Sequence, residues 1–194
     1  GQGYVLTSPL QLAVMTARIA TGRAVVPRLV RMIDGQEIEP APAPSIGLTP
    51  EILAGVQSGM FDVVNGNHGT AKGSRIVDEA MLFAGKTGTS QVRNISAAER
   101  ARGVISNEDL PWERRDHALF VGFAPYDNPR YAVSVVVEHG GGGSTAAAPI
   151  ARDIILRAMS DGLPPLTAYP ASPRGRIETM LNELPLRAPD DSAA

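Results

Sequence analysis

Ala84-Gly85-Lys86-Thr87-Gly88-Thr89-Ser90-Gln91-Val92 is the stretch from which the fold can be predicted. It places a cation, three hydroxyls and two glycines directly after an apolar run, a pattern that predicts a strand carrying a binding site. Side chains alternate along a strand, so Thr87 and Thr89 should face one way and Lys86 and Gly88 the other. An edge strand of this kind can pair with an extended peptide, bind its carboxylate through hydroxyls and point a backbone N–H at a developing oxyanion.

Two other interpretations compete for this stretch. A Walker phosphate loop also contains Gly-Lys-Thr, but it requires a glycine five positions before Gly85, where this chain has Ala80, and a helix afterwards. Because the residues after Lys86 favour a strand, nucleotide binding is not expected. An ordinary strand with a surface lysine is the remaining alternative, and the surrounding chain has to decide.

Composition limits the class of protein. The chain has 194 residues, 43% of them hydrophobic, which is enough for one globular domain with a core. A net charge of −2 gives no reason to expect nucleic acid as a partner, and the absence of cysteine excludes disulfides and thiolate metal sites. No motif indicates a metal or another cofactor. No apolar run approaches the ~20 residues of a membrane span.

The chain opens on Gly1-Gln2-Gly3-Tyr4, with neither a methionine nor a signal peptide. We therefore expect a fragment or a processed piece, with an anchor and further residues upstream.

Two helices are predicted ahead of the strand. Ser8 caps the first, over residues 9–21, with proline and glutamine at the positions of a capping box and Gly22 as the stop. We expect this helix to pack in the core. Thr49 caps the second, which should run to about Val64.

The segment between these helices reads as a hairpin and a connection. Residues 24–33 should form a strand that turns at Asp34-Gly35 and returns over residues 36–39, while the prolines of 40–44 indicate an extended surface connection. After the second helix comes a glycine-rich loop, residues 65–73. Its His68 could act as an acid or base, but a solvated loop histidine is the expected reading.

The strand that contains Lys86 is predicted to start at about Met81 and to have two neighbours. Residues 116–124 and 131–138 form an antiparallel hairpin, so three adjacent strands result. The charged segment 93–115 reads as an insertion beside the site, anchored by Trp112. Asp116 and His117 are adjacent on a strand and face opposite ways, so they should orient the insertion instead of forming a catalytic triad.

The C-terminal part begins with four glycines. Residues 139–144 are expected to be a flexible turn or a loop in close approach to the site, and hardly regular structure. A closing helix should span residues 146–159, with one apolar face that contains Ile150, Ile154, Ile155 and Ala158. We assign residues 1–163 to the domain and 164–194 to a proline-rich, mostly disordered tail, with a short helix at 176–183.

Taken together, these pieces resemble the transpeptidase domain of the class B penicillin-binding proteins, in the penicillin-binding protein 2 group of the rod-elongation system. The resemblance covers approximately residues 1–160 and implies an α+β fold, an antiparallel β-sheet flanked by helices as in β-lactamases, incomplete in this chain. Its ordered motifs are Gly1-Gln2-Gly3-Tyr4 with the Ser8 helix, Gly69-Thr70-Ala71, Lys86-Thr87-Gly88-Thr89, Arg115-Asp116-His117, Phe123-Ala124-Pro125 and Glu138-His139 with its glycines.

This family uses the motifs Ser-x-x-Lys, Ser-x-Asn and Lys-Thr-Gly, and only the last occurs here. The two lysines, Lys72 and Lys86, are preceded three positions earlier by Gly69 and Phe83. The resemblance implies that the other two motifs lie upstream, so this chain alone should be inactive.

The resemblance also implies a function. A serine from the upstream part attacks the D-Ala-D-Ala carbonyl of a peptidoglycan stem peptide, and the acyl group passes to an amine of a neighbouring strand. In this chain Lys86 would supply positive potential, Thr87, Gly88 and Thr89 would bind the substrate, and the Thr89 N–H would be an oxyanion donor. β-Lactams would acylate the same serine.

Location and partners follow from the family as well: the periplasmic face of the bacterial inner membrane, a membrane glycan polymerase and proteins of the elongation complex. Two enzymes remain as alternatives on the same fold, a D,D-carboxypeptidase and a β-lactamase. A β-lactam-binding sensor or scaffold without catalysis is a third.

Overall fold

Three strands form the centre of the molecule. A computed structural model describes residues 5–183; the Gly1–Tyr4 piece of the resemblance and residues 184–194 lie outside the described residues. The strands are β3 (Ala84–Ser90), β4 (His117–Ala124) and β5 (Tyr131–Val137). They pair antiparallel in the order β3-β4-β5, as predicted.

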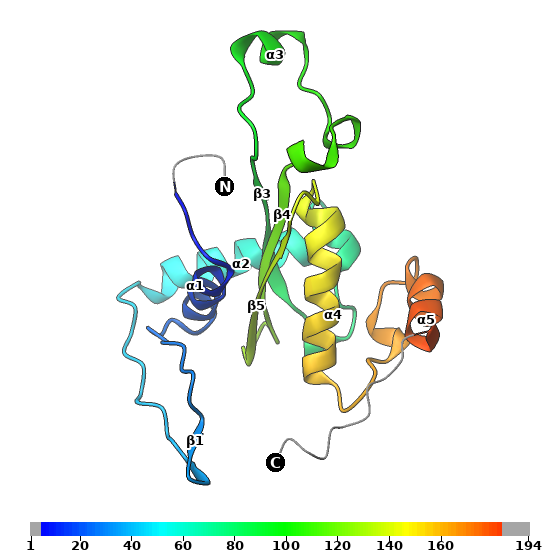
Figure 1. Ribbon diagram of the computed structural model, residues 1–194. Coiled ribbons are helices and arrows are strands. Elements are labelled where there is room, and N and C mark those ends of the chain that lie inside the picture. Colours follow the sequence, from blue (N-terminus) through cyan, green and yellow to red (C-terminus); the bar gives the residue numbers. More distant parts are fainter. Residues whose placement is uncertain (1–4, 184–194) are drawn as a thin grey trace.

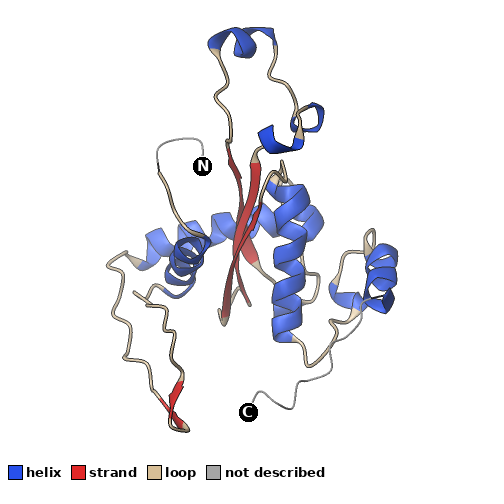
Figure 2. Cartoon of the chain, in the orientation of Figure 1, coloured by secondary structure: helices blue, strands red, loops and turns tan. Residues whose placement is uncertain are grey.

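Helices cover both faces of this sheet. The helices α1 (Pro9–Thr21) and α2 (Pro50–Asn65) lie on one side, and α4 (Ala148–Met159) lies on the other (Figures 1 and 2). The alternation of β4 explains the two layers, because Phe123 packs with Ala20 and Met60 of the first pair while Phe120 packs with the α4 side. The result is the α+β architecture expected from the sequence.

The caps of the first two helices form as predicted. The Ser8 hydroxyl accepts the Gln11 N–H at 3.2 Å, and the Gln11 side chain accepts the Ser8 N–H at 2.8 Å. Gly22 ends α1 in the left-handed region, with φ 65°. The Thr49 hydroxyl caps α2. We expected α1 to pack in the core, but only Thr16 and Ala20 of this helix are buried.

The predicted hairpin exists but is much shorter. Only β1 (Met32–Ile33) and β2 (Gln36–Glu37) pair, around a turn in which Asp34 and Gly35 both have positive φ. Figure 1 shows that this hairpin projects away from the sheet, so its apolar residues have no sheet face to cover. Residues 40–44 have no regular structure, as expected of a proline-rich connection.

The start of β3 differs from the prediction. Met81 belongs to a short 3₁₀ turn, Glu79–Met81, in which the Asp78 carboxylate accepts the Ala80 N–H at 3.0 Å. The strand therefore begins at Ala84, after the buried Phe83. A local side-chain cap overrides the apolar run that suggested an earlier start.

Of the apolar face predicted for α4, only Ile155 is buried, and the rest of that prediction is wrong. Ile150 and Ile154 are 43% and 49% exposed, whereas the buried positions are Ala148, Ala151, Arg152, Ile155 and Leu156. Small residues let the helix approach the sheet closely, so Ala148 and Ala151 face inward, while Ile150, Ile154 and Ala158 are exposed. Helical structure also starts earlier than predicted, with a wide π-helical turn at Gly143–Ala147.

Residues 164–183 differ from the mostly disordered tail that the sequence suggested. They form a short 3₁₀ turn and α5 (Arg174–Glu183), which includes the predicted short helix. Tyr169 is 1% exposed, and its ring lies 4.8 Å from the Arg152 guanidinium. This segment folds back onto α4 and completes the core on that side.

Candidate functional site

All four residues of the Lys-Thr-Gly-Thr motif lie on β3, and β4 is the one neighbour of β3 among the described residues. β3 is therefore an edge strand over residues 5–183. The predicted alternation is present in its register. Thr87 and Thr89 are opposite Phe120 and Ala118, which face α4, while Lys86 and Gly88 are opposite Val121 and Leu119.

Polar contacts hold the motif at the surface. Lys86 is exposed, and its ammonium group donates to the Thr87 carbonyl oxygen at 2.8 Å. The Thr87 and Thr70 hydroxyl oxygens lie 3.1 Å apart in a hydrogen bond. A positive charge and two hydroxyls thus gather at one edge of the sheet, which suits a carboxylate.

Thr70 is a site residue for which sequence reasoning assigned no role. It belongs to the Gly69-Thr70-Ala71 piece of the resemblance, and its place in that ordered set was the only signal. The Ala71 N–H donates to the Val63 carbonyl at 2.9 Å, and this bond fixes the loop to the end of α2. The loop can then present the Thr70 hydroxyl to β3.

The backbone of the glycine-rich segment 139–144 lies close to the backbone of β3 at Gly88. A Cβ at Gly143 would lie 2.6 Å from the Gly88 carbonyl oxygen and would also meet the Leu119 carbonyl oxygen. The glycine-rich segment is therefore the close-approach loop that was one of the two predicted options. Its last glycine, Gly143, opens the π-helical turn, which corrects the expectation that the segment hardly forms regular structure.

His68 behaves as a solvated loop histidine. It is exposed in a hollow of about 390 Å³ that is also lined by Asp62, Asn67 and Thr70. No side-chain hydrogen bond joins it to another residue within the described part of the chain. The structure thus gives no support to an acid or base role.

The charged insertion connects β3 to β4 and extends beyond the end of the sheet, where it includes α3 (Ala97–Arg102) (Figure 1). Arg93 donates from both terminal nitrogens to Glu99, at 2.7 and 2.6 Å. This pair lowers the pKa of the Glu99 carboxyl and raises the pKa of Arg93. Trp112 is 54% exposed, and its ring packs against His139 with centroids 4.4 Å apart, so it anchors the insertion through one ring contact.

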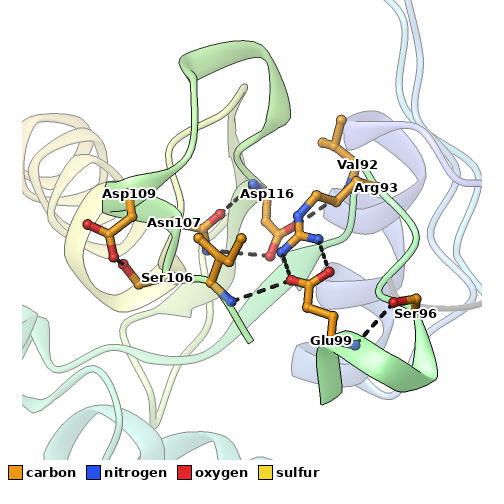
Figure 3. Close-up of polar contacts among 9 residues, drawn as sticks. Val92, Arg93, Ser96, Glu99, Ser106, Asn107, Asp109 and Asp116 are labelled. Carbon is orange, nitrogen blue, oxygen red and sulfur yellow. Dashed lines mark hydrogen bonds and ion pairs between the residues drawn. The ribbon is translucent and has the colours of Figure 1, made fainter. Parts of the chain in front are cut away.

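Asp116 orients the insertion, as predicted, whereas the His117 side chain contacts His139 outside it. The Asp116 carboxylate accepts from the Val92 N–H and from the Asn107 side chain, each at 3.4 Å (Figure 3). His117 instead accepts the His139 N–H through Nδ1 at 2.9 Å. The two side chains serve different partners and make no triad.

Between residues 5 and 183 no three histidine, aspartate or glutamate side chains come close enough to hold a metal ion together. None of the helices in that range combines the length and the hydropathy of a membrane span.

Comparison with known proteins identifies relatives of this arrangement. Residues 1–156 match the family described as penicillin binding protein transpeptidase domain. The peptidoglycan D,D-transpeptidase MrdA of Haemophilus influenzae is 36% identical over 87% of this chain, and that of Acinetobacter baumannii is 40% identical over 76%. The chain spans about a quarter of the length of these relatives, 26% and 22%.

Solved structures give the same result. A crystal structure of Pseudomonas aeruginosa PBP2 in complex with WCK 5153 is 40% identical, with a TM-score of 0.62, and the match covers 83% of this chain and 31% of that one. A complex between PBP2 and MreC from Helicobacter pylori is 32% identical, with a TM-score of 0.59 over 78% of this chain and 24% of that one.

Proposed function

The chain belongs to the family of penicillin-binding protein transpeptidase domains, and we propose that it supplies the substrate-binding strand of a peptidoglycan D,D-transpeptidase that cross-links stem peptides in cell-wall elongation. β3 is the observation that carries this proposal. Within residues 5–183 it offers a free edge on which Lys86, Thr87 and Thr89 stand within three positions of one another. The names of the relatives support the reaction class.

The reaction consists of two acyl transfers. A serine hydroxyl from the upstream part of the polypeptide attacks the carbonyl carbon of the penultimate D-alanine. An ester bond forms, the peptide C–N bond breaks, and the terminal D-alanine leaves with the serine proton on its nitrogen. An amine of a neighbouring stem peptide then attacks the ester, a new peptide bond forms, and the serine recovers a proton. β-Lactams would form the same ester and remain attached.

Each group on β3 has one task in this reaction. The Thr87 and Thr89 hydroxyls bind the carboxylate of the leaving D-alanine, and the ammonium group of Lys86 adds positive potential beside it. The Thr89 N–H donates to the oxyanion that develops on the attacked carbonyl, a contact whose loss typically costs ~3–4 kcal/mol of transition-state stabilisation. Gly88 adds no side chain on the face that carries Lys86, and on the α4 side Gly143 lies against its backbone.

Two unpartnered surfaces support the proposal that more polypeptide packs on this chain. β5 has no neighbour beyond β4 within residues 5–183, and the outer flank of α4 exposes Ile150 and Ile154. An open sheet edge and exposed isoleucines are what an incomplete domain leaves uncovered. We expect the part that carries Ser-x-x-Lys and Ser-x-Asn to cover them.

Location and partners are part of the same proposal. The protein is expected at the periplasmic face of the bacterial inner membrane, held by an anchor outside this chain and working beside a membrane glycan polymerase. The Helicobacter pylori PBP2 complex with MreC supports a partner from the elongation machinery.

Labelling the full-length protein with a fluorescent penicillin tests the proposal. We expect a covalent adduct on the serine of Ser-x-x-Lys. A second assay, with a stem peptide and an acceptor amine, should give cross-linked product in excess over hydrolysed product. Hydrolysis of the stem peptide without cross-linking would favour a D,D-carboxypeptidase. Rapid release of hydrolysed penicillin would favour a β-lactamase. A stable penicillin adduct without turnover of the peptide would favour the sensor.

A further inference from the structure

Asp116 is a junction between three parts of the chain. Its carboxylate accepts the Val92 N–H, just past β3, at 3.4 Å, and the Asn107 side-chain N–H, in the middle of the insertion, at 3.4 Å. Its own N–H donates to the Asn107 side-chain oxygen at 2.8 Å. Its carbonyl oxygen accepts the Gly141 N–H at 2.8 Å. One half-buried residue thus joins both ends of the insertion and its middle, as Figure 3 shows, and also holds the glycine-rich loop.

These contacts lie where a bound donor peptide would run. On the proposed function, the leaving carboxylate is at Thr87 and the attacked carbonyl is at the Thr89 N–H. The part of the peptide before that carbonyl therefore continues past Ser90 toward Val92 and the insertion. Ser90 is opposite His117, the residue after Asp116, so the junction stands at the end of the peptide-binding edge.

The Asp116 junction also reaches the close contact between the glycine-rich loop and β3. Gly141 is held by the Asp116 carbonyl, and Gly143, two residues later, lies against the Gly88 backbone. The Gly141 contact uses the Asp116 backbone, whereas the Val92 and Asn107 contacts use its carboxylate, so a change of the side chain alone acts on the insertion and leaves the support behind β3 in place.

We infer that Asp116 is a positioning residue for the donor stem peptide. It fixes the 93–115 insertion against the end of β3, so that the part of the peptide upstream of the scissile bond meets an edge that is already in place. This inference rests on the proposed function. It concerns the long peptide substrate specifically, because a penicillin carries only a short acyl side chain beyond the Thr89 position.

The Asp116→Asn variant in the full-length protein gives the sharpest lesion. The new amide cannot accept from both Val92 and Asn107, so at one contact two N–H groups face each other. An additional Asn107→Asp change reverses the direction of that bond. The new carboxylate at position 107 accepts from the amide at 116 and from the 116 backbone, and the 116 amide oxygen accepts from Val92. Charge and hydrogen bonds are restored.

We expect Asp116→Asn to lower kcat/KM for stem-peptide cross-linking about 10-fold while penicillin acylation changes less than about 2-fold, since a small misplacement of a long substrate is costly. The double variant should recover peptide kcat/KM to within about 2-fold of wild type. Asp109→Asn, which changes an insertion carboxylate bound to the Ser106 hydroxyl at 2.8 Å, is the matched control and should behave as wild type.

Three results would overturn the inference. Asp116→Asn could lower the rates with peptide and with penicillin equally, or leave the peptide reaction unchanged. The double variant could also be as slow with the peptide as the single one. If Asp116→Asn does not fold, Asn107→Ala and the double variant give the same peptide-to-penicillin comparison. A wild-type protein that no penicillin acylates would overturn the proposed function, and this inference with it.

Discussion

Thr87 and Thr70 form the smallest unit of the proposed site, two hydroxyl oxygens 3.1 Å apart at the edge of β3. Thr87→Val keeps the shape and removes the hydroxyl that is expected to bind the substrate carboxylate. A hydrogen bond to a charged group contributes about 1.5–3 kcal/mol, so penicillin acylation of the full-length protein should slow by roughly 10- to 100-fold.

Thr21→Val is the control for this prediction, because the Thr21 hydroxyl is exposed and donates within α1 to the Ala17 carbonyl. It should leave the rate unchanged. If Thr87→Val is acylated at the normal rate, Thr87 has no part in carboxylate binding.

Tyr169 provides a pH-dependent readout of the core. Burial raises its pKa to about 12 from 10.0, the nearby Asp153 carboxylate adds to the shift, and Arg152 opposes it. The folded state therefore disfavours tyrosinate. Between about pH 10 and about pH 12 the unfolded chain releases this proton first, so stability falls as the pH rises through that window.

Tyr169→Phe should remove this part of the alkaline loss of stability, measured as the unfolding midpoint at increasing pH. A tyrosinate absorbance titration should lose its latest step in the same variant. A titration curve unchanged by Tyr169→Phe would show that this hydroxyl is not the buried one.

Single residues also show what sequence can and cannot predict at this scale. The facing of the side chains on β3 could be expected from the period of a strand, since Thr87 and Thr89 alternate with Lys86 and Gly88. The Thr70 contact could not, because it joins residues 17 positions apart through the folding of a loop. A loop without periodicity gives no direction for its side chains.

At the scale of elements, β3 and the π-helical turn before α4 meet through the backbones of two glycines. A Cβ at Gly143 would lie 2.6 Å from the Gly88 carbonyl oxygen, closer than real contacts allow. Gly143→Ala should therefore displace one of the two backbones, lower the free energy of unfolding by about 1–3 kcal/mol and slow penicillin acylation.

Gly55→Ala in α2 is the control, since a Cβ at this position meets nothing within 4 Å. It should be neutral or stabilising, because alanine is the better helix former. If Gly143→Ala has the same stability and the same acylation rate as Gly55→Ala, the close approach of Gly143 to β3 does not matter for function.

Element boundaries were predictable where a local signal marks them. The caps at Ser8 and Thr49 and the turn at Asp34-Gly35 all formed where the sequence placed them. The inward face of α4 was not predictable from apolar spacing. Its packing depends on small residues, Ala148 and Ala151, and on a π-helical turn that changes the helix phase before Ala148.

At the scale of the whole molecule, residues 164–183 close the core on the α4 side. Prolines and charges in this segment suggested disorder, but one aromatic residue, Tyr169, and one isoleucine, Ile177, are buried in it. Composition is a mean over the whole segment, so a disorder prediction based on it does not detect one or two residues that become buried. The family match ends at residue 156, so this closing segment lies beyond it.

Tyr169→Ala should lower the free energy of unfolding by about 3–5 kcal/mol, as expected for removal of a large aromatic side chain from a core. Penicillin acylation measured below the unfolding temperature should stay near normal, because the Tyr169 ring packs on Arg152 of α4 and supplies no group to the proposed site on β3. Met180→Ala, 49% exposed on α5, is the control and should cost little.

The central claim is that β3 places a positive charge beside a bound peptide terminus. The direct measurement is the second-order rate of fluorescent penicillin acylation of the full-length protein for Lys86→Ala and Lys72→Ala, the only two lysines of this chain. The account predicts a fall of about 100-fold or more for Lys86→Ala with unchanged thermal unfolding, and a wild-type rate for Lys72→Ala. A folded Lys86→Ala protein acylated at the wild-type rate would contradict it.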